Sequence, residues 1–360
     1  MNRPARTRQS GAVLILTLWT IVLLSMLVLV MAAEARFSAE LSRSQIGRTG
    51  NRVDTLTALN AAEMELLLET MPEPAADTDP EDDDDVRNPD FRFNGQALEL
   101  AYAHPETVEV RIYDHAGKIN LRNLTEDRLR LMLEHLMEAA EGEVDDDEIT
   151  ELLAAWGDWI DEDDGIRVEG AEEEYYLSLE QPYLPRQGQL ESVEELLLIR
   201  GFDKWFGDVN LGAAFTLHTD SDLVNLNTAS REALALIPGL DAEAIDAIVA
   251  YRQEQDFTDF LELEDIVSDD GMAEFQPWVD FAGVSPFYTV LVVPGELTRP
   301  GAAEGETEAG SEAGTEAGSR QEAWRQPRFG GLSKVVRVDD SSQRPFVLRV
   351  DPVARLPILD

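Results

Sequence analysis

The sequence predicts an α+β fold, in which a long N-terminal helix and an antiparallel sheet are interrupted by a large inserted α-domain. Helical spacing of apolar residues continues from residue 12 to residue 71, and Pro72 ends it. Apolar residues with a period of two follow at 97–113 and return at 287–350, which indicates strands at both ends of the remaining chain. Between them, residues 124–285 have the periodicity of helices.

The chain is strongly acidic and contains no cysteine. Its 360 residues include 72 Asp and Glu but only 29 Lys and Arg, so the formal net charge is −43. Because Lys and Arg supply the affinity for a phosphate backbone, no nucleic acid is expected as a partner. The absence of cysteine excludes thiolate catalysis, cysteine-ligated metal centres and disulfides. The 44% of hydrophobic residues is enough for a buried core.

Residues 1–33 combine a basic leader with an apolar helix. The leader, residues 1–11, contains Arg3, Arg6 and Arg8, and residues 11–33 carry no charged side chain. Such a helix rises about 34 Å, enough for residues 12–33 to cross a membrane, and the positive-inside rule places the N-terminus in the cytoplasm. The alternative is a signal peptide cleaved after Ala35, but the apolar segment is longer than the roughly 7–15 residues usual for signals. Residues 34–71 continue the helix.

The leader and helix resemble the N-terminus of type IV prepilins and pseudopilins, with Gly11 ending the leader and Ala12 beginning the helix. The resemblance implies cleavage after Gly11 by prepilin peptidase, methylation of the Ala12 amine, and assembly through the helix. The residues assigned to that assembly helix are Leu14, Leu16, Leu18, Leu23 and Leu27. Most such proteins have Glu where this chain has Leu16. In lacking this Glu, the chain resembles the large minor pseudopilin at the filament tip. A Glu buried in the membrane needs a partner on a neighbouring subunit, and a tip subunit has no neighbour ahead of it.

Local signals predict the elements that follow. Residues 72–89 form an acidic, proline-rich loop, and strands are expected at 97–101 and 108–113. Thr125 is expected to cap a helix, and Ser192 with Glu195 to form a capping box for a helix at 193–199 that stops at Gly201. Closing strands are predicted at 287–293, 334–338 and 346–350. Glu-Ala-Gly repeats at 295–325 indicate a disordered linker between the first two of them.

Four short motifs follow one another in the soluble part. They are GKINL at 117–121, DWID with GAE and YY at 158–176, PR with L, S and EL at 185–196, and VNLNTA at 224–229. Their order resembles the family of general secretion pathway protein K, a minor pseudopilin of type II secretion systems. The resemblance implies a pilin-like body formed by residues 72–123 and 286–360, with the inserted α-domain at 124–285.

Residues 225–252 look like a helix-hairpin-helix (SAM-like) unit inside the α-domain. Asn227 or Thr228 is expected to cap its first helix, and Pro238 with Gly239 to form the turn. DNA-binding versions have a second glycine and nearby cations, whereas this chain has Asp241 and mostly acidic neighbours. We therefore expect the hairpin to pack against protein. A competence-type DNA-binding protein anchored in the inner membrane is the alternative function.

An acidic cluster after the second helix is the strongest candidate for a metal site. Ca²⁺ takes about six to eight oxygen ligands. The side chains that could supply them are Asp158, Asp161, Asp163, Asp164 and Glu172. The spacing is not that of an EF-hand, since Ile166 stands where Gly is needed. Two interpretations stay open: a bound Ca²⁺, which the resemblance to protein K also implies, or an exposed acidic loop with Arg167 as its counter-charge.

No catalytic signature is present in the sequence. Ser/His/Asp, G-x-S-x-G, phosphate-loop and H-E-x-x-H patterns are absent, and the carboxylate pairs lie in acid-rich loops that we expect to be solvated. A secreted calcium-dependent hydrolase is therefore the weaker alternative. The resemblance implies a non-enzymatic minor pseudopilin that caps the periplasmic pseudopilus tip and supports export across the outer membrane. It also implies single-pass inner-membrane localisation with a periplasmic bulk. The implied partners are other minor pseudopilins, the major pseudopilin, prepilin peptidase and secreted protein substrates.

Overall fold

Two compact units make up the chain, one ending at Val53 and the other beginning at Asp54. The computed structural model describes residues 10–70, 93–100, 104–105, 107–163, 165–294, 331–338 and 344–352. The first nine residues of the leader, the acidic loop at 72–89 and the Glu-Ala-Gly linker at 295–325 lie outside the described residues.

A single helix, α1 (Ser10–Thr70), runs through the first unit and into the second. It ends one residue before the predicted boundary, just ahead of Pro72. In the second unit its buried residues Ala58, Leu59, Ala62 and Leu66 pack against the sheet. They recur every three to four residues, so they lie on one face of the helix.

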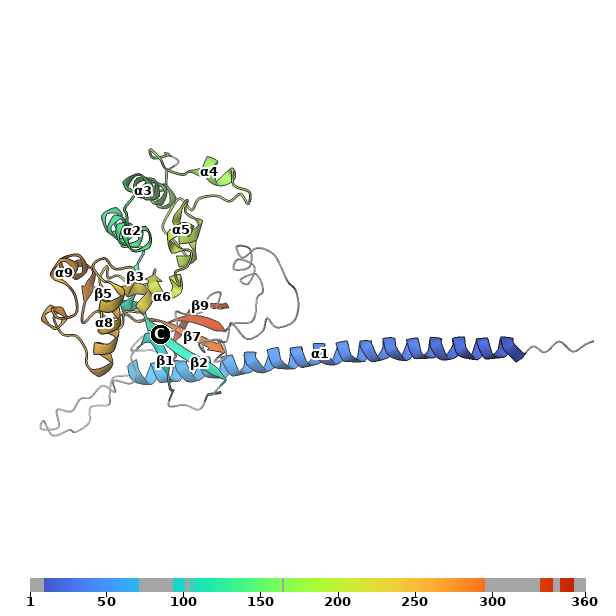
Figure 1. Ribbon diagram of the computed structural model, residues 1–360. Helices are drawn as coiled ribbons and strands as arrows, with labels where there is room; N and C mark the ends of the chain where they lie inside the picture. Colours follow the sequence, from blue (N-terminus) through green and yellow to red (C-terminus); the bar gives the residue numbers. More distant parts are fainter. Residues whose placement is uncertain are drawn as a thin grey trace, which may run out of the picture. The chain divides into compact units, whose positions relative to one another are not determined.

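The sheet has five antiparallel strands in the order β1-β2-β7-β8-β9. The strands are β1 (Asn94–Leu98), β2 (Val108–Asp114), β7 (Phe287–Pro294), β8 (Leu332–Arg337) and β9 (Phe346–Pro352). Alternate residues such as Val110, Ile112 and Val290 share one core with the buried residues of α1, which explains the period of two in the sequence. Figure 1 shows β1 and β2 beside the C-terminal part of α1. The predicted start of the first strand at residue 97 is wrong. β1 begins at Asn94 because pairing with β2 extends past a bulge, ahead of the apolar alternation.

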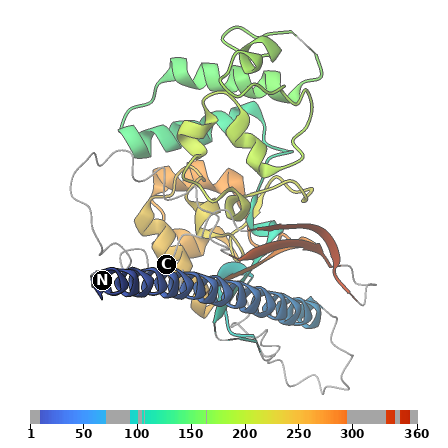
Figure 2. The same ribbon diagram turned by 90° about the vertical axis from the view of Figure 1, so that its right-hand side faces the viewer.

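Between β2 and β7 lies a mostly helical region with its own large core. Its longer helices are α2 (Glu126–Glu141), α3 (Asp146–Ile160) and α8 (Ala242–Glu254). The shorter ones are η1 (His115–Gly117), α4 (Glu173–Leu177), η2 (Val193–Leu198), α5 (Phe202–Phe206), α6 (Leu211–Ala214), α7 (Arg231–Leu234), η3 (Phe260–Leu263), α9 (Asp269–Phe275) and η4 (Gln276–Trp278). In Figure 2 the green helices of residues 126–206 lie above the yellow and orange helices of residues 211–278.

The sequence suggested a purely helical region, but the structure also contains short strands there. Two parallel pairs of two-residue strands join distant segments: β3 (Ile119–Asn120) with β4 (Phe215–Thr216), and β5 (Val224–Asn225) with β6 (Val279–Asp280). Such short pairs leave no periodic pattern in the sequence. The first pair joins the beginning of the helical region to its middle, and the second joins the middle to the end.

Helix caps agree with the sequence at some positions and differ at others. Thr125 caps α2 through the backbone N–H of Arg128, and Ser192 with Glu195 forms the predicted capping box. Gly201 does not end that helix. The capped segment η2 is a short 3-10 helix, and Gly201, with φ of 81°, is the N-cap of α5.

Candidate functional site

The first unit presents an uncovered apolar helix. The span Ile15–Ser38 of α1 has 24 residues, a mean hydropathy of 2.6 and no buried share, which makes it the one span in the described part that is long and apolar enough to cross a membrane. Of the predicted assembly residues, Leu16, Leu18, Leu23 and Leu27 are exposed. Gly11 and Ala12 lie in the first turn of α1, and their side chains and that of Leu14 lie outside the described residues. An apolar surface of this extent needs lipid or other helices to cover it.

The acidic cluster of the second unit is organised around a guanidinium group. Asp158 has no exposed surface and accepts a hydrogen bond of 3.2 Å from the backbone N–H of Arg167. The Arg167 side chain lies 3.6 Å from Asp158 and 3.8 Å from Asp161, and it donates to Glu126 at 2.6 Å. The expectation that these carboxylates are solvated is therefore wrong for Asp158. The burial of Asp158 is possible because the half-exposed guanidinium of Arg167 compensates the charge.

A glycine makes room for that cation. A Cβ atom on Gly157 would lie 1.9 Å from the guanidinium of Arg167, so with a side chain at this position of α3 the guanidinium would have to shift. Gly157 stands immediately before Asp158 in the sequence, and the guanidinium of Arg167 lies against the helix backbone at this position. This close approach accounts for a glycine inside the helix.

The predicted calcium ligands do not converge on a shared cage in the described part of the chain. Asp158 and Asp161 face Arg167, and Asp163 accepts the backbone N–H of Gly165 at 2.8 Å. Glu172 is buried at the N-cap of α4, and Asp164 lies outside the described residues. Burial raises the pKa of the Asp161 carboxyl, and the nearby charge of Asp163 adds to this while Arg167 opposes it. Among the described residues, no group of three or more potential ligands is positioned to hold a metal.

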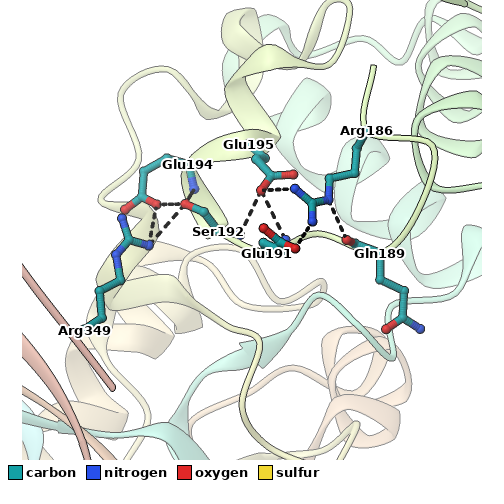
Figure 3. Close-up of polar contacts among 7 residues, drawn as sticks. All are labelled: Arg186, Gln189, Glu191, Ser192, Glu194, Glu195 and Arg349. Carbon is teal, nitrogen blue, oxygen red and sulfur yellow. Dashed lines mark hydrogen bonds and ion pairs between the residues drawn. The ribbon is translucent and has the colours of Figure 1, made fainter. Parts of the chain in front are cut away.

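A second polar cluster joins the helical region to the edge strand β9. Figure 3 shows Arg186 and Arg349 approaching the capping box from opposite sides. Arg186 is paired with Glu191, lies 3.8 Å from Glu195 and donates to the carbonyl of Gln189 at 3.2 Å. The carboxylate of Glu195 accepts the backbone N–H of Ser192 at 3.1 Å. These bonds account for the spacing of the motif at residues 185–196.

On the other side, Arg349 of β9 reaches across to η2. Its guanidinium donates to the carboxylate of Glu194 at 3.1 Å and to the hydroxyl of Ser192 at 3.2 Å, and it is also paired with Asp351 (Figure 3). Burial opposes the ionised form of Glu194, but hydrogen bonds from Ser192 and the backbone, together with Arg349, lower its pKa overall. Arg349 thus offsets one carboxylate of the acidic helical region.

The GKINL motif forms a buried polar network that sequence reasoning missed. The Lys118 ammonium is 2% exposed and donates to the carbonyl of Gly212 at 2.6 Å and to the Thr289 hydroxyl at 2.9 Å. The ring of His115 lies 2.8 Å from the hydroxyls of both Thr216 and Thr289. The network ties β7 to β4 and α6. The signal available in the sequence was the position of Lys118 between Gly117 and the apolar Ile119, which is an unusual setting for an exposed lysine.

Burial controls the charge of this network. It lowers the pKa of Lys118 to about 7, against the attraction of Glu232 and Asp114. Burial also raises the pKa of Asp114 to about 7, against a backbone hydrogen bond and Lys118. The pKa of His115 is well below its ordinary value, again through burial, so the ring is neutral.

Polar side chains of the helix-hairpin-helix unit donate hydrogen bonds to backbone carbonyls of the helical region. Ser230, and not Asn227 or Thr228, caps α7, because Asn227 instead donates to the carbonyls of Phe257 and Phe281. Arg252 is buried and donates to the carbonyls of Leu226 and Ala229 at 2.9 and 2.6 Å.

The turn of this hairpin is covered by another part of the chain. Gly239 has a φ of 84°, and a Cβ atom there would lie 2.1 Å from the carbonyl oxygen of Gly271, in α9. The hairpin amides of DNA-binding versions face a phosphate, whereas this turn is packed against protein backbone. The hairpin therefore serves as a packing unit of the helical region.

Comparison with known proteins identifies two segments. Residues 117–206 match the model of the family described as type II secretion system (T2SS), protein K. This segment is similar to protein K. Residues 219–268 match the helix-hairpin-helix motif, which includes the hairpin predicted at 225–252.

Relatives of the chain carry the protein K name. It is 35% identical over 99 residues to type II secretion system protein K of Aeromonas hydrophila, an alignment that covers 27% of this chain and 30% of the relative. It is 33% identical over 90 residues to the protein K of Klebsiella pneumoniae, covering 25% and 28%. The alignments thus span less than a third of either relative.

The fold was also compared with solved structures. The chain resembles the crystal structure of the GspK-GspI-GspJ complex of the enterotoxigenic Escherichia coli type 2 secretion system, with 14% identity and a TM-score of 0.45. The match covers 86% of this chain and 97% of that chain.

The GKINL motif, the Asp158 and Arg167 pair and the capping box all lie within residues 117–206. The chain spans less than a third of these relatives, so the expectation of a non-enzymatic role stays a prediction. The mixed α and β fold with an antiparallel sheet is confirmed.

Proposed function

We propose that this chain is a minor pseudopilin of a type II secretion system, held in the inner membrane by the N-terminal part of α1 before assembly. One combination carries the proposal: a segment similar to protein K occurs in a chain whose N-terminal helix has an unburied 24-residue span with a mean hydropathy of 2.6. A globular enzyme has no use for such a helix, whereas a subunit that assembles through it does. The orientation follows from the leader, whose arginines keep the N-terminus in the cytoplasm and the rest in the periplasm.

In this proposal the second unit is a pilin-like body. The C-terminal part of α1 packs on the sheet through Leu59 and Leu66, while the N-terminal part stays free to pack against helices of neighbouring subunits. Leu16, Leu18, Leu23 and Leu27 would pass from lipid to an equally apolar helical bundle, a transfer that costs little free energy. Other minor pseudopilins and the major pseudopilin are the proposed partners.

We place the subunit at the periplasmic tip of the pseudopilus. Leu16 stands where most pseudopilins have Glu, so this helix offers no carboxylate to the amine of a subunit ahead of it. The helical region between β2 and β7 is too large to repeat along a shaft. A tip subunit would support assembly below it and contact secreted proteins above it.

Processing provides the direct test. We expect prepilin peptidase to cut after Gly11 and the new Ala12 amine to be methylated. Intact-mass and N-terminal peptide analysis of the protein from its native membranes should therefore find a chain that begins at methylated Ala12. A chain that begins at Met1 or Arg36 would overturn the proposal.

A matched pair of glycine variants sharpens this test. Gly11→Val should leave the leader attached, because the peptidase recognises the glycine. Gly50→Val should be cut normally, since Gly50 lies inside the same helix with open space around it. Equal cutting of both variants would contradict the assigned cleavage site.

A calcium site remains a prediction with a specific condition. The carboxylates of Asp158 and Asp161 already face Arg167, so a cation would have to displace this guanidinium to gain both ligands.

DNA binding is not proposed, because Arg252 is buried and the hairpin turn is covered by Gly271.

A further inference from the structure

A pocket lies between the sheet and the helical region, on the face of the sheet opposite α1. Its volume is about 230 Å³, and its walls come from β2, β7, β8, η2, α6 and the end of β9. Tyr113, Leu197, Leu211 and Leu291 make the lining mainly apolar. This volume accommodates one large apolar side chain with room for its backbone.

The strand at the rim of this pocket is an exposed edge. Among the described residues β9 pairs only with β8, so its outer backbone groups face no second strand. Phe346 and Val350 expose 66% and 51% of their surface. Edge strands in soluble proteins are ordinarily protected by charges, prolines or bulges that prevent pairing. In β9 the bulge is in the pairing with β8, at Val335 and Val336, and Pro352 stands at the last position. The charged residues of β9 are Arg349 and Asp351, which are paired with each other, and Arg349 is also directed to Glu194 (Figure 3).

The charge at the rim is unbalanced. Glu194 and Asp351 both line the pocket, and a single guanidinium, that of Arg349, is paired with both. One negative charge is left at the mouth, in a chain whose net charge is −43. A basic group beside an apolar side chain would complement this mouth.

We propose that β9 and this pocket form a docking site for an extended segment of a partner protein, which adds a strand beside β9 and inserts an apolar side chain, flanked by Lys or Arg, into the pocket. The backbone of the edge strand supplies affinity, and the pocket supplies specificity, as in other strand-addition complexes. On a strand paired with β9, a residue opposite Asp351 lies about 5 Å away, close enough for an aromatic side chain to reach the pocket. This site goes beyond the proposed function and does not depend on cleavage at Gly11.

Peptide binding to the full chain in detergent micelles tests the proposal. The probe is a fluorescent nine-residue peptide in which Val and Phe alternate with Lys and Thr. We expect saturable binding by anisotropy, and slower hydrogen exchange of the amides in residues 346–352. The same peptide N-methylated at alternate backbone positions keeps every side chain but cannot pair as a strand, and it should bind at least about tenfold more weakly. Absence of binding, or equal binding of both peptides, would overturn the proposal.

Two glycine variants test the pocket. Gly212 lines the pocket and an added Cβ atom meets no atom closer than 3.9 Å, so Gly212→Phe should fill the space without disturbing the carbonyl bonded to Lys118. It should weaken peptide binding by about tenfold or more. Gly188 also has open space around it but lies away from the pocket, and Gly188→Phe should leave binding unchanged. Equal weakening by both variants would count against the pocket.

The chain's own C-terminus is the competing occupant. Residues 353–360 follow directly on the pocket-lining Pro352. Removal of these residues should not alter peptide affinity if a partner fills the site. A tenfold gain in affinity after their removal would assign the pocket to the chain itself and overturn the proposal.

Discussion

Asp158 is fully buried beside Arg167, whose backbone N–H and side chain both contact its carboxylate. Asp158→Asn should lower the free energy of unfolding by about 2–3 kcal/mol, because the buried side chain loses its charge-assisted contacts with the backbone N–H and guanidinium of Arg167. Asp163→Asn, in the exposed part of the same loop, should cost less than about 0.5 kcal/mol. Thermal or denaturant unfolding of the two variants measures the difference. Similar stabilities of the two variants would show that the charge of Asp158 does not stabilise the fold.

Calcium should compete with Arg167. If the acidic cluster binds Ca²⁺, millimolar Ca²⁺ should raise the melting temperature of the full chain, and Arg167→Gln should show the larger increase because its carboxylates are no longer paired. Asp161→Ala is the matched loss variant and should reduce the shift. An unchanged melting temperature in wild type and Arg167→Gln would exclude the site, and an equal shift in Asp161→Ala would place Ca²⁺ elsewhere.

The buried lysine should make stability depend on pH on the alkaline side of neutrality. Burial lowers the pKa of Lys118 to about 7 in the folded state, from an ordinary value of 10.5. Between these values the unfolded chain binds the proton and the folded chain does not. The stabilising contribution is therefore complete above pH 10.5 and is lost as pH falls to about 7.

Lys118→Met removes this titration and tests its sign. Relative to the variant, the wild type should gain stability between about pH 8 and 10, with a slope of up to about 1.4 kcal/mol per pH unit. The window lies above the range in which Asp114, whose pKa is about 7, loses its proton. Lys204→Met, at a half-exposed lysine paired with Glu148, should run parallel to wild type. Parallel curves for Lys118→Met and wild type would show that Lys118 does not titrate in this range.

The helix-hairpin-helix unit should not bind DNA. Arg252 donates to carbonyls inside the unit, and Arg231 is paired with Asp246 at 2.5 Å. The full chain should produce no shift of a labelled duplex at about 100 mM salt. A salt-dependent shift that is lost in Arg231→Ala but kept in Arg130→Ala, in α2, would revive the DNA-binding alternative.

Much of the fold was predictable because its signals are local. The uninterrupted period of α1, the alternation in β2 and β7, and the cap at Thr125 each depend on residues within a few positions of one another. The N-caps Gly201 of α5 and Ser230 of α7 were not predicted, because other residues near each helix end are also suitable caps by type. Asn227 is an acceptable cap by type, but its amide is already used to hold Phe257 and Phe281.

By itself, the sequence determined the apolar helix that needs a partner, the positions of the strands β2, β7 and β9, the capping box and the resemblance to protein K. Periodicity and short motifs carry this information, since it lies within neighbouring residues. Only the tertiary structure decided that Arg167 compensates Asp158, that Lys118 is buried on Thr289, and that Arg349 reaches Glu194. These pairs join residues between 9 and 171 positions apart. Which charge meets which depends on how the whole chain packs, and a sequence pattern does not record that packing.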